Sequence, residues 1–158
     1  MKAMKEPTRV GVVGCGYWGP NLVRNLRQPA GCEVKLLCDT NEERLAHMRQ
    51  LYPAVATTRR FEDLLNGADL DAVVIATPVH SHFRMAKDCL SMGKHVFVEK
   101  PMTRTAAEGE ELVALAERKG LVLMVGHTFL FSPAVRRDLS SRGYPAAERA
   151  RSDKDVPG

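Results

Sequence analysis

The chain has 158 residues, which allows one domain with a buried core and is too short for two domains of ordinary size. Hydrophobic residues make up 44% and charged residues 27%, a balance that excludes fibrous and disordered classes. The formal net charge of +4 comes from scattered basic residues, and the densest pairs, Arg59-Arg60 and Arg136-Arg137, are too short to follow a phosphate backbone. We therefore expect no nucleic-acid partner.

Cysteine spacing and hydropathy indicate the compartment. The four cysteines show no CxxC spacing and no paired histidines, so we expect free thiols, a reducing compartment and no metal site. Residues 1–7 lack the apolar run of a secretory signal, and no window reaches the length of a membrane-spanning helix. The sequence therefore predicts a cytoplasmic protein without a membrane partner.

Apolar runs alternate with amphipathic segments from residue 9 to about residue 137, the pattern of β-α units that feed a parallel sheet. The run at 72–76 is apolar throughout, which predicts a central strand with helices on both faces. We expect strands at 10–13, 34–38, 54–57, 72–76, 96–98 and 121–125, and helices from Pro20 and at 41–51, 61–65, 81–92 and 105–119. This number of strands, alternating with helices, predicts an α/β fold, a Rossmann-type doubly wound parallel sheet.

Capping signals mark the ends of two of these helices. Ser81 is placed to cap the helix that Gly93 ends. Thr105 and Glu108 form a capping-box pattern for the helix that Gly120 ends. We expect both side chains, Ser81 and Thr105, to accept from helix amides.

The periodicity disappears after residue 137. Residues 138–158 mix Ser, Arg, Asp, Gly and Pro with isolated apolar side chains and cannot bury enough surface to fold alone. The sequence therefore predicts a domain at 1–137 and a disordered or aberrant tail at 138–158.

A glycine-rich turn, Gly14-Cys15-Gly16-Tyr17-Trp18-Gly19, directly follows the first predicted strand and precedes the first helix. Gly14 permits a tight turn, Gly16 lets a pyrophosphate approach bare backbone, and Gly19 lets the helix pack closely. An acid, Asp39, stands twenty residues after Gly19 at the end of the second strand. This context predicts a dinucleotide site; the alternative is a turn with a structural role only.

Asp39 is suited to accept hydrogen bonds from the adenosine ribose hydroxyls. A 2′-phosphate would face its charge and those of Glu42 and Glu43, so NAD is favoured over NADP. Arg44 is near enough to keep NADP as the lesser option. The alternative for Asp39 is an N-cap of the following helix.

A methyltransferase that binds S-adenosylmethionine would also suit the turn and the acid, so Glu99-Lys100-Pro101 decides between the two chemistries. Lys100 follows the carboxyl end of a predicted parallel strand, where open α/β sheets bind ligands. A lysine there can bind a substrate hydroxyl and take part in proton transfer as hydride leaves the carbon. The alternative is a solvated surface lysine.

Together these motifs resemble the Gfo/Idh/MocA oxidoreductase family over residues 9 to about 137. The matching segments, in the family's order, are residues 11–19, 76–78, 99–102 and 126–129. The stretches 16–21 and 126–129 are most similar to members that act on nucleotide-linked sugars, and inositol dehydrogenases are also similar. The resemblance implies hydride transfer between NAD and a sugar or polyol hydroxyl.

The resemblance also implies site residues. Lys100 and His127 would be catalytic, although a semi-buried structural histidine is the alternative for His127. Tyr17 and Trp18 either flank the pyrophosphate or nicotinamide or pack beneath the turn. The residues expected to border the cofactor are Gly14, Gly16, Tyr17, Trp18, Gly19, Asp39, Thr77, Pro78, His82, Glu99 and Lys100. Three of them have structural alternatives: that Thr77 only ends a strand, that Pro78 only breaks it, and that His82 is a first-turn helix residue on the surface.

Full-length family members carry a second α/β domain with most of the substrate pocket and the interface of a homo-oligomer. We expect this chain to be the cofactor-binding half alone, through truncation or a shifted reading frame near residue 138. It should bind NAD, while turnover would need groups from the missing domain. The alternative function is a non-catalytic dinucleotide-binding module.

Overall fold

A computed structural model describes residues 6–67 and 69–126 of the chain. In this part a parallel sheet is formed by the strands β1 (Thr8–Val13), β2 (Cys32–Cys38), β3 (Ala56–Thr58), β4 (Ala72–Ile75), β5 (His95–Val98) and β6 (Leu123–Val125). The helices are α1 (Gly19–Leu26), α2 (Glu42–Leu51), α3 (His82–Ser91) and α4 (Ala106–Lys119), with the short helical turns η1 (Asp63–Gly67) and η2 (Val79–Ser81). The predicted Rossmann-type fold is therefore confirmed.

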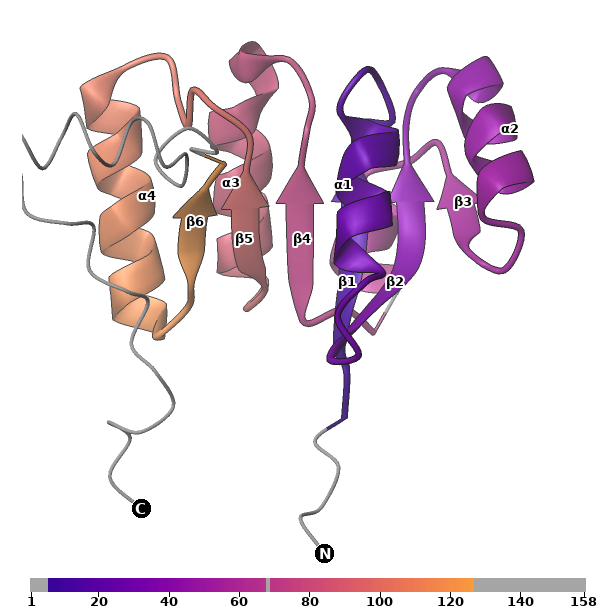
Figure 1. The fold of residues 1–158 in the computed structure, drawn as a ribbon. Helices are drawn as coiled ribbons and strands as arrows, with labels where there is room; N and C mark the ends of the chain where they lie inside the picture. Colours follow the sequence, from indigo (N-terminus) through magenta and orange to yellow (C-terminus); the bar gives the residue numbers. More distant parts are fainter. Residues whose placement is uncertain (1–5, 68, 127–158) are drawn as a thin grey trace, which may run out of the picture. The chain divides into compact units, whose positions relative to one another are not determined.

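The strands follow the order β3-β2-β1-β4-β5-β6. Neighbouring strands pair in parallel, and the arrows all point the same way, so the carboxyl ends share one edge of the sheet (Figure 1). The chain crosses from the outer strand β3 back to the centre at β4, which makes β1 and β4 the switch point where such sheets bind ligands. β4 lies between β1 and β5, and its predicted central position is confirmed.

Helices cover both faces of the sheet, with α1 in front of it and α3 behind it in Figure 1. On β4, Val74 belongs to the core cluster under α1 and α2, while Val73 and Ile75 belong to the cluster under α3 and α4. Since successive side chains of a strand point to opposite faces, a strand with both faces buried is apolar throughout. This is why residues 72–75 show no alternation.

The capping signals give two different outcomes. Thr105 and Glu108 form the capping box that the sequence predicts, with Glu108 N donating to Thr105 Oγ1 at 3.2 Å. Gly120 ends the same helix in the left-handed region, at φ 63°. Ser81 stands at the predicted N-cap position of α3, but its side chain makes no capping hydrogen bond, because its hydroxyl donates to Pro78 O at 2.8 Å.

Near the β3 edge, the expected boundaries are also displaced. The strand expected at 54–57 runs from Ala56 to Thr58, where it pairs with residues 36–38 of β2. The helix expected at 61–65 is the single turn η1, shifted two residues towards the C-terminus. Register with β2 and the side-chain contact between Thr58 and Asp63 set these boundaries, and neither is readable from local periodicity.

The predicted domain end at residue 137 and the predicted tail at 138–158 lie outside the described residues. Within residues 6–67 and 69–126, no helix combines the length and apolar character needed to cross a bilayer.

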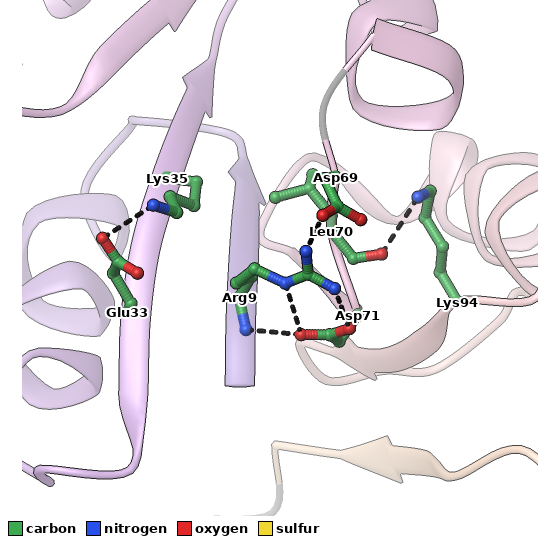
Figure 2. Close-up of polar contacts among 7 residues, drawn as sticks. All are labelled: Arg9, Glu33, Lys35, Asp69, Leu70, Asp71 and Lys94. Carbon is green, nitrogen blue, oxygen red and sulfur yellow. Dashed lines mark hydrogen bonds and ion pairs between the residues drawn. The ribbon is translucent and has the colours of Figure 1, made fainter. Parts of the chain in front are cut away.

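At the amino ends of the strands, Arg9 on β1 is held by two acids that precede β4 (Figure 2). Its side chain donates to Asp71 at 3.1 and 2.8 Å, its amide donates to Asp71 at 2.8 Å, and its guanidinium also pairs with Asp69. These hydrogen bonds lower the pKa of the Asp71 carboxyl to about 2. The cluster lies at the edge of the sheet opposite the carboxyl ends, so it serves stability.

We expect Asp71→Asn to lower the urea midpoint of unfolding at pH 7, by an amount that shrinks as the solution is acidified. The folded pKa of Asp71 lies below its ordinary value of 3.8, so its contribution is present above about pH 4 and is lost as the pH falls towards 2. Urea unfolding of both proteins between pH 2 and 7 measures the gap. Glu33→Gln, in the exposed Glu33–Lys35 pair, is the control and should show little gap at any pH. A gap for Asp71→Asn that does not change with pH would contradict this assignment.

Candidate cofactor and active site

A pocket of about 550 Å³ opens at the carboxyl ends of β1, β2 and β4, at the switch point of the sheet. It brings together six of the residues predicted to border the cofactor: Gly14, Gly16, Tyr17, Asp39, Thr77 and Pro78. The other predicted cofactor residues in the described part do not line it; these are Trp18, Gly19, His82, Glu99 and Lys100. His127 lies outside the described residues.

The three glycines of the turn meet different surroundings. Gly14 has φ +96°, and a Cβ built on it would lie 2.5 Å from the backbone oxygen of Ala76. A Cβ on Gly19 would lie 2.7 Å from Gly14 O, so this glycine lets α1 begin directly against the turn. A Cβ on Gly16 would meet nothing closer than the Arg44 guanidinium, at 3.7 Å. Gly14 and Gly19 are thus required by the fold, whereas the space beside Gly16 is open.

The turn leaves backbone donors unpaired beside the pocket, which Gly16 and Tyr17 line. In the described part of the chain, the amides of Gly16, Tyr17 and Trp18 donate to no protein acceptor, and they come just before the start of α1. Unpaired amides at a helix N-terminus bind phosphate groups well, through their N–H groups and the positive end of the helix dipole. The turn therefore has the chemistry of a pyrophosphate site.

Tyr17 and Trp18 stand out from the turn, with 85% and 55% of their surface exposed. Their rings form an edge-to-face pair with centroids 5.3 Å apart. Packing beneath the turn, the alternative raised for them, is wrong. Apolar Cys15 occupies that position instead, with 4% of its surface exposed.

Asp39 links the turn to the second strand. Its Oδ2 accepts from the amide of Cys15 at 2.7 Å, and its Oδ1 accepts from the amide of Asn41 at 2.8 Å. Asn41, not Asp39, is the N-cap of α2 and accepts from the amide of Arg44 at 3.1 Å. A carboxylate has about four lone-pair positions, so these two bonds leave acceptor capacity on Asp39, which lines the pocket although its side chain is only 5% exposed.

The thiols beside Asp39 are chemically quiet. Burial, and then the charge of Asp39, raises the pKa of both Cys15 and Cys38 to about 12. A thiol protonated at neutral pH is a poor nucleophile and packs as a small apolar group. All four cysteines are free, as expected. Cys15 and Cys38 therefore support the turn by packing.

Several pocket residues were not singled out as ligands from the sequence. Arg59 and Phe61 follow β3, and Met85 lies on the first turn of α3, where its sulfur lies 3.7 Å from Thr77 Oγ1. Arg59 Nε donates to the carbonyl of Thr40 at 3.2 Å, which fixes its guanidinium beside the end of β2. The position of Arg59 just beyond a parallel strand was the available signal, and Met85 offered none.

The Glu99-Lys100-Pro101 turn lies at the carboxyl end of β5. The amide of Glu99 donates to Ile75 O of β4 at 2.9 Å, and the Lys100–Pro101 peptide bond is cis. Lys100 is exposed to solvent. A Cβ on Gly126 would lie 3.0 Å from Glu99 Oε1, so the Glu99 carboxylate lies against the backbone that follows β6.

His82 occupies a different place from the one expected. Only 1% of its surface is exposed, its Nε2 lies 2.6 Å from Thr77 O, and its Nδ1 lies 2.9 Å from Pro101 O. The ring is therefore inserted between the end of β4 and the turn that carries Lys100.

Comparison with known proteins gives the family. Residues 8–127 match the family model described as "Oxidoreductase family, NAD-binding Rossmann fold", GFO_IDH_MocA. A 4-carboxy-2-hydroxymuconate-6-semialdehyde dehydrogenase from a Sphingobium strain is 32% identical over 126 residues, covering 80% of this chain and 40% of that protein. The chain thus spans about two fifths of the length of this relative.

Two similar solved structures are described as complexes with a nicotinamide cofactor. GenD2 from gentamicin A biosynthesis, in complex with NAD, superimposes with a TM-score of 0.80 and 26% identity, over 89% of this chain and 40% of GenD2. Biliverdin reductase from Synechocystis, in complex with biliverdin and NADP+, gives 0.79 and 30%, over 85% and 42%. Both cofactors occur among similar proteins. The chain belongs to the Gfo/Idh/MocA family of oxidoreductases and corresponds to its NAD(P)-binding Rossmann domain.

Proposed function

We propose that the chain is the cofactor-binding half of an NAD-dependent dehydrogenase that transfers hydride between the nicotinamide and a hydroxyl-bearing carbon of a sugar or polyol, nucleotide-linked sugars included. One observation carries the proposal: a pocket with unpaired amides at the switch point stands next to a strand end that bears a lysine. The first feature suits a dinucleotide and the second suits proton transfer.

The strand order gives the direction in which a dinucleotide would lie. β2, which Asp39 directly follows, is on one side of the glycine turn, and β4 and β5 are on the other. With the pyrophosphate on the turn, an adenosine ribose would meet Asp39 and the nicotinamide would lie towards Thr77 and Lys100. This orientation puts the reacting ring on the side of the lysine.

NAD is the cofactor that we propose, because the carboxylate of Asp39 would repel a 2′-phosphate and can accept from ribose hydroxyls. Arg44 NH1 lies 3.6 Å from Asp39 Oδ2, and Arg59 lines the same pocket. These two guanidinium groups are the features that would favour NADP. The relative affinity for the two cofactors therefore tests the assignment of Asp39.

The bound nicotinamide would supply the hydride acceptor or donor. The part of Lys100 is to hold the substrate hydroxyl and exchange its proton as the carbon changes oxidation state. His127 is proposed as a second proton-transfer group. A dinucleotide-binding module without turnover is the second candidate, favoured because Lys100, in the described part of the chain, does not itself line the pocket.

Calorimetric titration with NADH and with NADPH tests the proposal. We expect NADH to bind with a Kd between about 1 μM and 1 mM, and NADPH to bind at least about tenfold more weakly. A folded chain that binds neither cofactor at millimolar concentration would refute the proposal. A preference for NADPH would indicate that Arg44 and Arg59, and not Asp39, determine the choice of cofactor.

Reduction of NAD with a panel of UDP-sugars and inositols then separates the dehydrogenase from the binding module. If turnover is seen, Lys100→Met should lower kcat about 10²–10⁴-fold and leave NADH affinity unchanged. Lys35→Met, at the middle of β2 and outside the pocket lining, is the matched control. Tight binding without reduction of NAD by any substrate would favour the module.

A further inference from the structure

His82 joins the two loops on which the proposed reaction depends. Its ring contacts the carbonyl oxygen of Thr77, which follows β4 and lines the pocket. It also contacts the carbonyl oxygen of Pro101, the residue after Lys100. β4 and β5 lie side by side in the sheet (Figure 1), so one imidazole spans the space between their carboxyl ends.

Both partners of the ring are backbone carbonyl oxygens, which only accept hydrogen bonds. Distances of 2.6 and 2.9 Å are those of hydrogen bonds. Either tautomer of the ring donates to one of these carbonyls and packs against the other, so the ring contacts both strand ends whichever nitrogen carries the hydrogen. With 1% of the residue exposed, water cannot replace a missing bond cheaply.

The charged groups around the ring do not supply another explanation for its orientation. In the described ranges, no carboxylate lies within ion-pair distance of His82; Glu99 and Lys100 are the titratable groups of the turn that it contacts, and Arg84 is the nearest along α3. The amino end of α3 opposes a positive charge. The two carbonyls are therefore what holds the ring in place.

We propose that His82 is a positioning residue, which fixes the Lys100 turn against the Thr77–Pro78 wall of the pocket through its ring contacts with Thr77 O and Pro101 O. The proposal rests on the proposed function in assigning Lys100 to the reaction. His82 does not line the pocket, so a bound cofactor would meet Thr77 and Pro78 and not His82. Without the ring, the glycine turn, its free amides and Asp39 keep their positions in the pocket, and only the turn that carries Lys100 is no longer held against β4.

A measurement on the full chain tests this. Lysines methylated with ¹³C report on Lys100, whose signal is assigned by its absence in Lys100→Arg. Addition of NADH should shift this signal in the wild type. In His82→Ala the shift should fall by at least half, while NADH affinity stays within about threefold.

His82→Gln should restore part of the shift, since its amide can donate to one carbonyl, and His47→Gln on the exposed face of α2 should change nothing. A Lys100 signal that responds equally in wild type and His82→Ala would overturn the proposal. If His82→Ala does not fold, His82→Gln decides, because a response equal to that of the wild type would overturn the proposal. Failure of NADH to bind the wild type would refute the proposed function, and the position of the Lys100 signal in the ligand-free protein, which substitution of His82 should move, tests His82 alone.

Discussion

Gly16→Val should abolish detectable binding of NADH, a loss of at least about 100-fold, while the free energy of unfolding changes by less than about 1 kcal/mol. A Cβ at this position meets no protein atom closer than 3.7 Å, and that atom belongs to the flexible side chain of Arg44. The added carbons instead fill the space in which a pyrophosphate would reach the free amides of the turn. Function and stability are therefore expected to separate at this residue.

Calorimetry with NADH and urea unfolding together measure this separation. Gly31→Val is the matched control, because a Cβ there meets nothing within 4 Å and the residue is remote from the pocket. It should bind NADH as the wild type does. If Gly16→Val binds NADH normally, the phosphate does not approach the turn and the orientation proposed for the dinucleotide is wrong.

Gly14→Ala should do the opposite and destabilise the fold by about 3 kcal/mol or more. Gly14 has φ +96°, and its Cβ would lie 2.5 Å from Ala76 O, 2.6 Å from Ala76 C and 2.8 Å from Thr77 N. All three are backbone atoms of the segment after β4, so no side chain can move to relieve the contact. Loss of binding by this variant would then follow from loss of structure.

Gly93→Ala separates the two causes. Gly93 has φ +77°, but a Cβ built on it would meet nothing within 4 Å. The alanine should therefore destabilise the fold only through its strained backbone conformation, by about 1 kcal/mol. Urea unfolding of both variants gives the comparison. Equal losses for Gly14→Ala and Gly93→Ala would show that close packing of the turn against β4 contributes nothing.

The contrast at Gly14 and Gly16 bears on how the site could be read in advance. The glycine pattern, its place between strand and helix, and the acid after the second strand all predict a dinucleotide site, because those residue types are required by backbone geometry and charge. The roles assigned to Gly14 and Gly16 agree with their surroundings. Asp39 is predicted to face a ribose, which stays a prediction; in the structure its carboxylate accepts from the amides of Cys15 and Asn41, which spacing alone could not indicate.

Other features were decided by contacts between distant parts of the chain. The start of β3 depends on pairing with β2, and the β1–β2 register shifts after Val10, so that Lys35 has no partner on β1. Arg59 and Met85 enter the pocket because their loops and helices meet at the carboxyl edge. Local sequence carries no record of these approaches, since each partner lies far along the chain.

The sequence by itself determined the parallel order of strands and helices, the capping box at Thr105 and the glycine turn between β1 and α1, because periodicity, caps and glycine conformation act over a few residues. Only the tertiary structure decided the place of His82. Its position in the sequence is that of a first-turn helix residue near a cofactor, and its ring is buried because two strand ends, separated by twenty-odd residues of chain, close around it. Burial and hydrogen-bond partners are set by packing, and packing is a property of the whole domain.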